Sequence, residues 1–222
     1  MSGKKSILFW NVDTQNDFVE PWGKLYVKGA EKLKPKWAEI TKVARMMKIR
    51  VVNSADYHYV NSAEINEKPD HISTFPLHCL AGTKGAEFIP ETKPENPLVF
   101  NWDTTYDMMP LKVDVPQYRN FVILKDAFDV FAGNPVTVPL LEALNPEMVV
   151  VYGVTTNVCV YHAVKGLAQR VKQVYVLSDA IKELPKIPLP FEEWENMNVK
   201  LISSVDLFQS FKRGAKKRVP PE

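Results

Sequence analysis

Residues 149–170 read VVVYGVTTNVCVYHAVKGLAQR, and this stretch decides the fold. Four apolar β-formers at 149–152 lead through Gly153 and a small polar turn into a helical pattern that begins at Cys159. This order predicts a buried strand followed by a helix that carries a thiol at its amino end. Such ends have free N–H groups and partial positive charge, so they favour thiolate and can bind an oxyanion. Cys159 is therefore either a reactive nucleophile or a small apolar residue under a helix.

The composition is that of an ordinary globular domain. The chain has 222 residues, 45% hydrophobic and 24% charged, which suits one α/β domain. A formal net charge of +2 gives no sign of nucleic-acid binding, and much of the basic excess lies in KRGAKKR at 212–218. We recognise no membrane-spanning run and no secretory leader, so we expect no membrane partner. Two cysteines far apart predict no disulfide framework, and the expected compartment is the cytoplasm.

Strands and helices are expected to alternate along the chain. The predicted strands are 6–11, 49–55, 121–124, 149–152, 174–177 and 199–202. Helical patterns fall between them, with apolar spacing at Leu33, Trp37, Ile40, Ala44 and Met47, a start at Asn134 and Pro135, and a short helix at 190–198. The alternation predicts a doubly wound, mostly parallel sheet with helices on both faces.

Polar side chains follow the predicted strands at the points where these end. They are Asp13, Asp56, His58, Lys125 and Cys159. In a parallel sheet the carboxyl ends of the strands meet at one edge, where ligands bind. We therefore expect these side chains to converge.

Asp13, Lys125 and Cys159 together suit nucleophilic catalysis. A thiol is largely protonated at neutral pH, so it needs a base, here Asp13, and a cation, here Lys125, to become a nucleophile. Each residue also has an ordinary interpretation, because an Asp after a strand often caps a turn and a single Lys is usually solvated.

Asp56, His58 and His78 form a second set, which suits a divalent metal. A carboxylate, an imidazole two residues later and a further His from the next loop provide three ligands and leave positions open for water or substrate. Such D-x-H pairs also occur without a metal. We interpret the other two histidines, His71 and His162, as structural.

The motifs resemble those of a known family. DTQNDF from Asp13, Lys125 after a strand, and GVTTNVCV around Cys159 resemble the Asp, Lys and Cys triad of the isochorismatase-like cysteine hydrolase superfamily. The resemblance implies a three-layer α/β sandwich, catalytic roles for these three residues and a single domain over 1–211. We expect a loop insertion at 92–120 and a flexible basic tail at 212–222.

Within that superfamily, DYH at Asp56 and FPLHCLAGTKGAEF at 75–88 resemble the nicotinamidase branch. The resemblance implies that Asp56, His58 and His78 bind a divalent metal, with zinc expected and manganese or iron as alternatives. That metal would hold the pyridine nitrogen of the substrate. We also expect a homo-oligomer.

The same resemblance assigns a substrate pocket. Phe18 and Phe75 would flank a planar ring, and Val154 would contact the substrate. The bond between Val154 and Thr155 would be cis, and the backbone amides of Thr155 and Cys159 would form the oxyanion hole.

Three features depart from the nicotinamidase pattern. Phe75 stands where Trp is usual, and Asn157 in TTNVC replaces an acid. The segment 92–120 is the third, and its Trp102, Tyr106 and Met109 are expected to cover the pocket.

The expected activity is release of ammonia from a small, heteroaromatic amide such as nicotinamide, through a thioester on Cys159. One alternative keeps the fold and takes another small amide or a vinyl ether, as isochorismatases do. Another is a catalytically silent member of the family that binds metal and a ligand.

Overall fold

The computed structural model describes residues 6–107 and 115–216, which contain one seven-stranded parallel sheet of order β3-β4-β2-β1-β5-β6-β7. The doubly wound fold expected from the sequence is therefore confirmed, and every strand pairing among the described residues is parallel. The strands are β1 (Ile7–Val12), β2 (Arg50–Asp56), β3 (Leu98–Phe100), β4 (Asn120–Lys125), β5 (Met148–Val154), β6 (Gln173–Lys182) and β7 (Lys200–Ile202).

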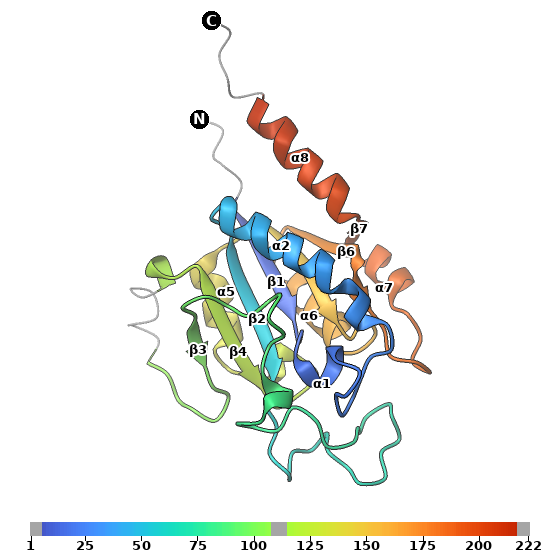
Figure 1. Ribbon diagram of the computed structural model, residues 1–222. Coiled ribbons are helices and arrows are strands. Elements are labelled where there is room, and N and C mark those ends of the chain that lie inside the picture. The colour runs from blue at the N-terminus through green and yellow to red at the C-terminus, as the bar shows by residue number, and fades with distance from the viewer. Residues whose placement is uncertain (1–5, 108–114, 217–222) are drawn as a thin grey trace, which may run out of the picture.

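Helices cover both faces of the sheet, with α2 on the near face in Figure 1 and α5 and α6 behind it. The α-helices are α1 (Asn16–Val19), α2 (Lys34–Met46), α4 (Val130–Gly133), α5 (Thr137–Leu144), α6 (Cys159–Ala168), α7 (Phe191–Asn196) and α8 (Ser204–Lys216). Short 3-10 helices are η1 (Ala30–Leu33), η2 (Lys84–Ala86) and η3 (Val115–Gln117). None of the helices in the described ranges is long and apolar enough to cross a membrane.

The apolar face predicted for α2 packs on the sheet. Trp37, Ile40 and Ala44 are buried, and the indole Nε1 of Trp37 donates to the carbonyl oxygen of Ala180 on β6 at 2.9 Å. Met47, also predicted on this face, follows the last helical residue and is exposed. The periodicity therefore identified the packed face but extended it one turn too far.

The structure differs from the expectation for segment 92–120. Residues Leu98–Phe100 form β3, which pairs with β4 and lies at the edge of the sheet. A three-residue edge strand carries little sequence signal, because one of its sides is solvated and no long apolar run is needed. Here Val99 is exposed while Phe100 is buried.

The expected tail at 212–222 differs as well. Residues 212–216 continue helix α8, which projects from the body of the molecule in Figure 1. The rest of that tail, 217–222, and Met109 of the segment 92–120 lie outside the described residues.

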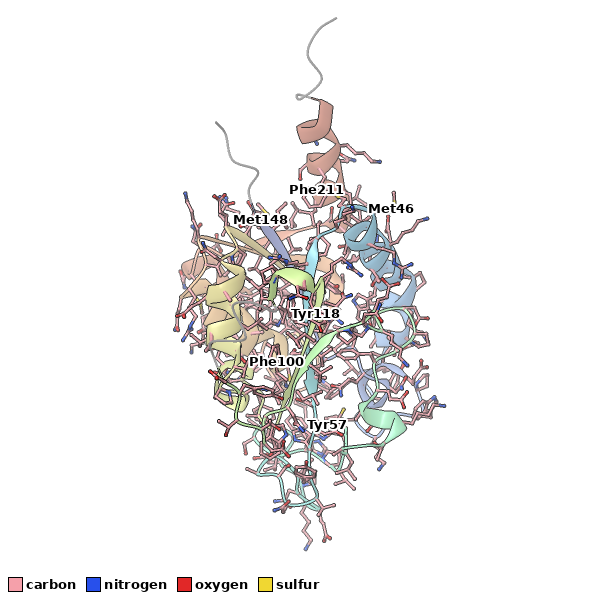
Figure 2. The ribbon with its side chains drawn as sticks, turned by 90° about the vertical axis from the view of Figure 1, so that its left-hand side faces the viewer. Met46, Tyr57, Phe100, Tyr118, Met148 and Phe211 are labelled. Atoms are coloured by element: carbon pink, nitrogen blue, oxygen red, sulfur yellow. The ribbon has the colours of Figure 1, made fainter. Side chains whose placement is uncertain are left out.

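The strand register brings the polar strand ends to one level. Asp56 at the end of β2 pairs directly with Lys125 at the end of β4. Val12 of β1 pairs with Ser54 on one side and with Gly153 on the other. Tyr57, which follows β2, marks this end of the molecule in Figure 2, opposite Met46 and Met148.

Gly153 should be intolerant of any side chain. Its φ is +128°, and a Cβ there would lie 2.0 Å from the carbonyl oxygen of Val12. We expect Gly153→Ala to lower the free energy of unfolding by about 3 kcal/mol or more, because backbone strain and a clash with a core strand add together. Urea denaturation measures the change.

Gly82→Ala is the matched control for this substitution. Gly82 also has a positive φ, +74°, but no atom lies within 4 Å of its added Cβ. It should lose only about 1–2 kcal/mol from the left-handed backbone. Equal losses for the two variants would contradict the importance of the close approach to Val12.

Candidate active site

Lys125 is the centre of the cluster of polar side chains at the carboxyl ends of the strands. Its side chain is 1% exposed, and its Nζ lies 3.0 Å from Asp13 Oδ2 and 3.8 Å from Cys159 Sγ. The same Nζ also forms an ion pair with Asp56 Oδ1. The structure therefore brings together the three residues that the sequence predicted as a triad, and adds one residue of the predicted metal set.

Asp13 is held in place by the neighbouring strand β2. Its N–H donates to the carbonyl oxygen of Ser54 at 3.1 Å, and the Ser54 hydroxyl donates to Asp13 Oδ1 at 2.7 Å. Asp13 has φ +50°, a left-handed conformation that Asp tolerates better than most residues. These contacts leave Oδ2 free to pair with Lys125. Sequence reasoning did not predict that Ser54 orients the Asp13 carboxylate.

Burial competes with the neighbouring charges in setting the protonation of this cluster. It opposes the charge of Lys125, but the carboxylates of Asp13 and Asp56 outweigh it and hold the pKa of Lys125 well above its ordinary value. Burial raises the pKa of Asp13, against the effect of Lys125. Burial also raises the pKa of the Cys159 thiol well above its ordinary value. Burial therefore opposes the thiolate that the helix end was expected to favour.

Cys159 begins helix α6, as the sequence predicted. Its backbone N–H donates to Thr155 Oγ1 at 3.3 Å, and the peptide bond between Val154 and Thr155 is cis, which confirms the expectation from the resemblance. Cys159 is 4% exposed, and its sulfur and carboxylate oxygens of Asp13 and Asp56 all lie within 4.8 Å of one another. The thiol thus has two carboxylates within 4.8 Å.

Asp56, His58 and His78 also converge, with ligand atoms within 4.8 Å of one another. The Nε2 atoms of His58 and His78 each lie 3.7 Å from Asp56 Oδ2. Asp126 Oδ1 lies 2.6 Å from Nδ1 of His58, and the carbonyl oxygen of Pro76 lies 2.7 Å from Nδ1 of His78. Both rings are therefore held by Nδ1, and both direct Nε2 toward the same carboxylate.

Glu64 is a fourth residue at this position, and sequence reasoning missed it. Its Oε2 lies 3.9 Å from His58 Nε2, and both atoms are buried without a hydrogen-bond partner among the described residues. Burial, with a smaller effect of Asp56, raises the pKa of Glu64 to about 7. The sequence feature that could have identified Glu64 is its position as an acid in the loop between the D-x-H pair and His78.

This donor set fits a divalent cation. Two imidazole nitrogens and one carboxylate oxygen within 4.8 Å of one another, with the Glu64 carboxylate 3.9 Å from His58 Nε2, match the ligands that zinc and related metals take in proteins. The unpartnered His58 Nε2 and Glu64 Oε2 are the atoms that a cation would satisfy. A cation would also offset the excess of carboxylates over the one ammonium of Lys125.

A second group of potential ligands, Asp13, Asp56 and Cys159, is different. Lys125 Nζ contacts all three of these side chains. Because an ammonium already occupies the position between them, we interpret this group as the triad with Asp56 and not as a second metal site.

The DTQNDF motif contributes more than Asp13. Gln15 Nε2 donates to the carbonyl oxygen of Asp56 at 2.7 Å, and Gln15 Oε1 accepts from the Asp56 N–H at 2.8 Å. Asp17 Oδ2 accepts from the N–H of Cys79 at 2.7 Å, directly after His78. These two side chains therefore hold the backbone at two of the predicted metal ligands.

A small cavity lies beside Cys159 and is bounded mainly by apolar side chains. Its volume is about 10 Å³, room for about one water molecule. It is lined by Phe18, Leu25, Asp56, Phe75, His78, Phe128, Thr155, Val158, Cys159 and Leu184. Phe18 and Phe75, which the resemblance placed beside the substrate, both line this cavity, whereas Leu25, Phe128 and Leu184 were not expected there.

Other expected pocket residues lie elsewhere. Val154 is fully buried but does not line the cavity. Trp102 Nε1 donates to the carbonyl oxygen of Tyr57 at 2.9 Å, and Tyr106 packs on Phe100 at 5.3 Å between ring centroids. Neither aromatic covers the cavity, because both pack beside β3 and the residues that follow β2. The described part of segment 92–120 is therefore not the predicted cover.

The remaining histidines lie outside both clusters. His71 is exposed in a loop. His162 stacks on Phe128 with ring centroids 6.4 Å apart, and burial lowers its pKa. Their predicted structural role remains compatible with these positions.

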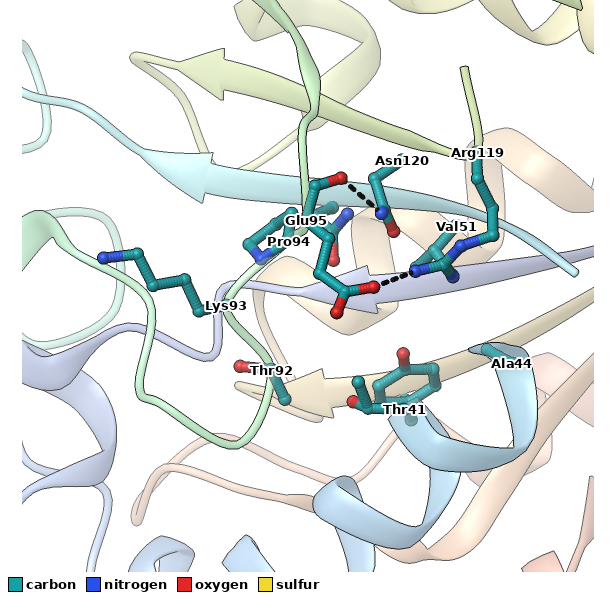
Figure 3. Close-up of a pocket in the computed structure, with 11 residues that line it drawn as sticks. Thr41, Ala44, Val51, Thr92, Lys93, Pro94, Glu95, Arg119 and Asn120 are labelled. Carbon is teal, nitrogen blue, oxygen red and sulfur yellow. Dashed lines mark hydrogen bonds and ion pairs between the residues drawn. The ribbon is translucent and has the colours of Figure 1, made fainter. Parts of the chain in front are cut away.

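A second water-sized cavity lies between α2, β2 and residues 92–95, as Figure 3 shows. Glu95 links its sides, since its carboxylate binds Arg119 at 3.0 Å and its carbonyl oxygen accepts from Asn120 Nδ2 at 2.7 Å. Asn120 begins β4, at the opposite end of that strand from Lys125. This cavity is therefore separate from the candidate active site.

Comparisons with known proteins identify relatives of this chain. The family model for the Isochorismatase domain matches residues 110–204. The nicotinamidase/pyrazinamidase of Mycobacterium tuberculosis is 35% identical over 88 residues, which are 36% of this chain and 41% of that protein.

Solved structures of similar fold cover most of the chain. Pyrazinamidase of Pyrococcus horikoshii in complex with zinc has a TM-score of 0.68 at 23% identity, over 89% of this chain and 99% of that one. N-carbamoylsarcosine amidase of Thermoplasma acidophilum has a TM-score of 0.68 at 21% identity, over 90% and 96%. The chain therefore has the isochorismatase-like α/β fold. Its expected resemblance to the isochorismatase-like hydrolases, and among them to the nicotinamidases, is confirmed.

We predict that Asp126 supports metal binding through His58. A carboxylate on Nδ1 orients the ring and makes the other nitrogen a better ligand, so Asp126→Asn should weaken zinc affinity about 10–100-fold. Competition with a chelator of known affinity measures this. Asp103→Asn is the control, because the Asp103 carboxylate accepts from the Tyr59 hydroxyl and should leave zinc affinity unchanged. An unchanged affinity in Asp126→Asn would refute the prediction.

Proposed function

We propose that this chain is a metal-assisted cysteine amidohydrolase that releases ammonia from a small amide, with a heteroaromatic amide such as nicotinamide as the leading substrate. The observation that carries the proposal is the buried contact of Lys125 Nζ with Asp13 Oδ2 at 3.0 Å and with Cys159 Sγ at 3.8 Å. A base, a cation and a thiol meet there at the amino end of a helix, beside a small cavity with apolar walls.

Asp13 begins the reaction as general base. The thiol of Cys159 is protonated at rest because burial raises its pKa. Asp13 takes this proton as sulfur attacks the carbonyl carbon of the amide, and the ammonium of Lys125 offsets the negative charge that remains. A base that acts only during the attack suits a nucleophile whose resting thiolate population is small.

The oxyanion that forms next needs hydrogen-bond donors. The N–H of Cys159 begins α6, and in this state it donates to Thr155 Oγ1. In the proposed mechanism the N–H groups of Thr155 and Cys159 bind the oxyanion. Asp13 then returns its proton to the leaving nitrogen, and ammonia departs from a thioester on Cys159.

Water completes the cycle. Asp13 takes a proton from water, the resulting nucleophile attacks the thioester carbon, and the carboxylic acid product leaves as sulfur regains a proton. In the resting site Lys125 is charged, because the carboxylates of Asp13 and Asp56 hold its pKa well above the ordinary value.

Asp56, His58, His78 and Glu64 would hold the metal. When bound, a divalent ion would supply a Lewis acid that binds an electron-pair donor of the substrate such as a ring nitrogen. The aromatic side chains of Phe18 and Phe75 lie 5.4 and 6.4 Å from the His78 ring, between centroids, and would contact the faces of a planar substrate.

Cys159→Ala should lower ammonia release from nicotinamide at least about 10³-fold, because it removes the atom that forms the acyl enzyme. Metal content, measured by elemental analysis, should not change. Cys79→Ala removes the only other thiol and should keep turnover. Ammonia release that persists in Cys159→Ala would exclude the proposed nucleophile.

A second candidate is the hydrolysis of another small amide. Phe75 in place of Trp changes the aromatic wall, and the fold neighbours include an N-carbamoylsarcosine amidase as well as pyrazinamidases. We expect kcat/KM to be highest for pyridine and pyrazine carboxamides in a panel that also holds N-carbamoyl amino acids and aliphatic amides. A higher value for an acyclic amide would favour the second candidate, and no turnover of any would favour a silent, ligand-binding protein.

A further inference from the structure

Residues 182–187, which run from the last residue of β6 into the following loop, are tied to the turn that precedes Cys159. Asn157 makes most of the connection, since its Nδ2 donates to the carbonyl oxygens of Leu184 and Ile187, each at 2.8 Å. Its Oδ1 accepts from the N–H of Leu184 at 3.0 Å. The N–H of Thr156 adds a bond to the carbonyl oxygen of Lys182 at 2.8 Å. Two segments about 27 residues apart are thereby held as one unit.

The chemistry of this connection requires an amide side chain. Asn157 is 6% exposed, and it uses both hydrogens of its NH₂ group on backbone carbonyl oxygens. A carboxylate could accept from the N–H of Leu184 but would face the two carbonyl oxygens with no hydrogen to donate. Buried carbonyl groups that lose their donor are costly. The departure from the acid of the nicotinamidase pattern at this position therefore has a structural reason.

Leu184 transmits this connection to the cavity. It is 8% exposed and lines the cavity beside Cys159 together with Val158. Leu184 is thus one of the side chains that limit the space next to the sulfur. Leu184 belongs to no helix or strand, so its place depends on the hydrogen bonds of its backbone.

We propose that Asn157 is a positioning residue for substrate, which holds Leu184 as an apolar wall of the cavity beside Cys159. This inference rests on the proposed function for its kinetic consequence. Asn157 and Leu184 together then contribute to substrate specificity. The substrates have an apolar edge that packs on Leu184.

Asn157→Asp tests the proposal with a side chain of the same shape. We expect KM for nicotinamide to rise about tenfold while kcat changes less than about threefold, because the wall is displaced and the triad is not. The matched control is Asn120→Asp, which removes one buried amide donor from the carbonyl oxygen of Glu95 at the opposite end of β4 (Figure 3). Its kcat and KM should match those of the unmodified protein.

Leu184→Ala removes the wall and leaves the hydrogen bonds in place, so it tests the idea even if Asn157→Asp does not fold. It should raise KM by a similar factor, and Asn157→Asp added to Leu184→Ala should have little further effect on KM. An unchanged KM in either single variant, or fully additive effects in the double variant, would overturn the proposal.

A readout that needs no substrate separates this inference from the proposed activity. We expect the alkylation rate of Cys159 by iodoacetamide, followed at its peptide by mass spectrometry, to rise several-fold in Asn157→Asp and Leu184→Ala but not in Asn120→Asp. If no amide is turned over and these rates still rise, the proposed function is wrong and the role of Leu184 as a wall of the cavity is supported. If amides are turned over and the rates do not rise, the role of Leu184 as a wall is wrong and the proposed function is supported.

Discussion

The ammonium of Lys125, buried between two carboxylates and a thiol, is the interaction on which the rest of the site depends. Its Nζ contacts Asp13, Asp56 and Cys159, and its side chain is 1% exposed. A charge at this depth is stable only when partners surround it, and removal of one partner typically costs about 3–5 kcal/mol. Asp56 belongs also to the predicted metal set. The Lys125 ammonium therefore links Cys159 to Asp56, His58 and His78.

The parallel sheet makes this arrangement possible through its register. Asp56 pairs with Lys125 across β2 and β4, and Val12 lies between Ser54 and Gly153. Neighbouring strands thus end at one level, and the residues at their ends meet without long loops. The close approach of β1 to β5 explains why Gly153 stands at the end of β5, since any Cβ would meet the Val12 backbone.

Side-chain hydrogen bonds hold the parts of the site that lie at the strand ends and in the loops. Gln15 binds the backbone of Asp56, Asp126 binds the His58 ring, and Asn157 binds the backbone of Leu184. Asp17 does the same for Cys79. Each contact joins segments that lie far apart in the chain, so the loops around the cavity derive their positions from a few polar side chains.

The sequence by itself determined the alternation of strands and helices, the polar residues at the strand ends and the position of Cys159 at the start of α6. These follow from local patterns, because buried strands need apolar runs and a turn marks each strand end. The convergence of Asp13, Asp56, His58, Lys125 and Cys159 was predictable for the same reason. The three-residue strand β3 was not, since a short edge strand needs no apolar run.

Only the tertiary structure revealed the positions of Glu64, Asp126 and Leu184 beside the site, and the burial of the thiol. From the sequence alone, an acid in a loop such as Glu64 is expected to be exposed to solvent. Its burial beside His58 depends on contacts between distant segments. The helix end alone predicted a thiolate at Cys159, whereas burial raises the pKa of the thiol in the folded chain. Desolvation belongs to the assembled core, and no local pattern in the sequence reports its strength.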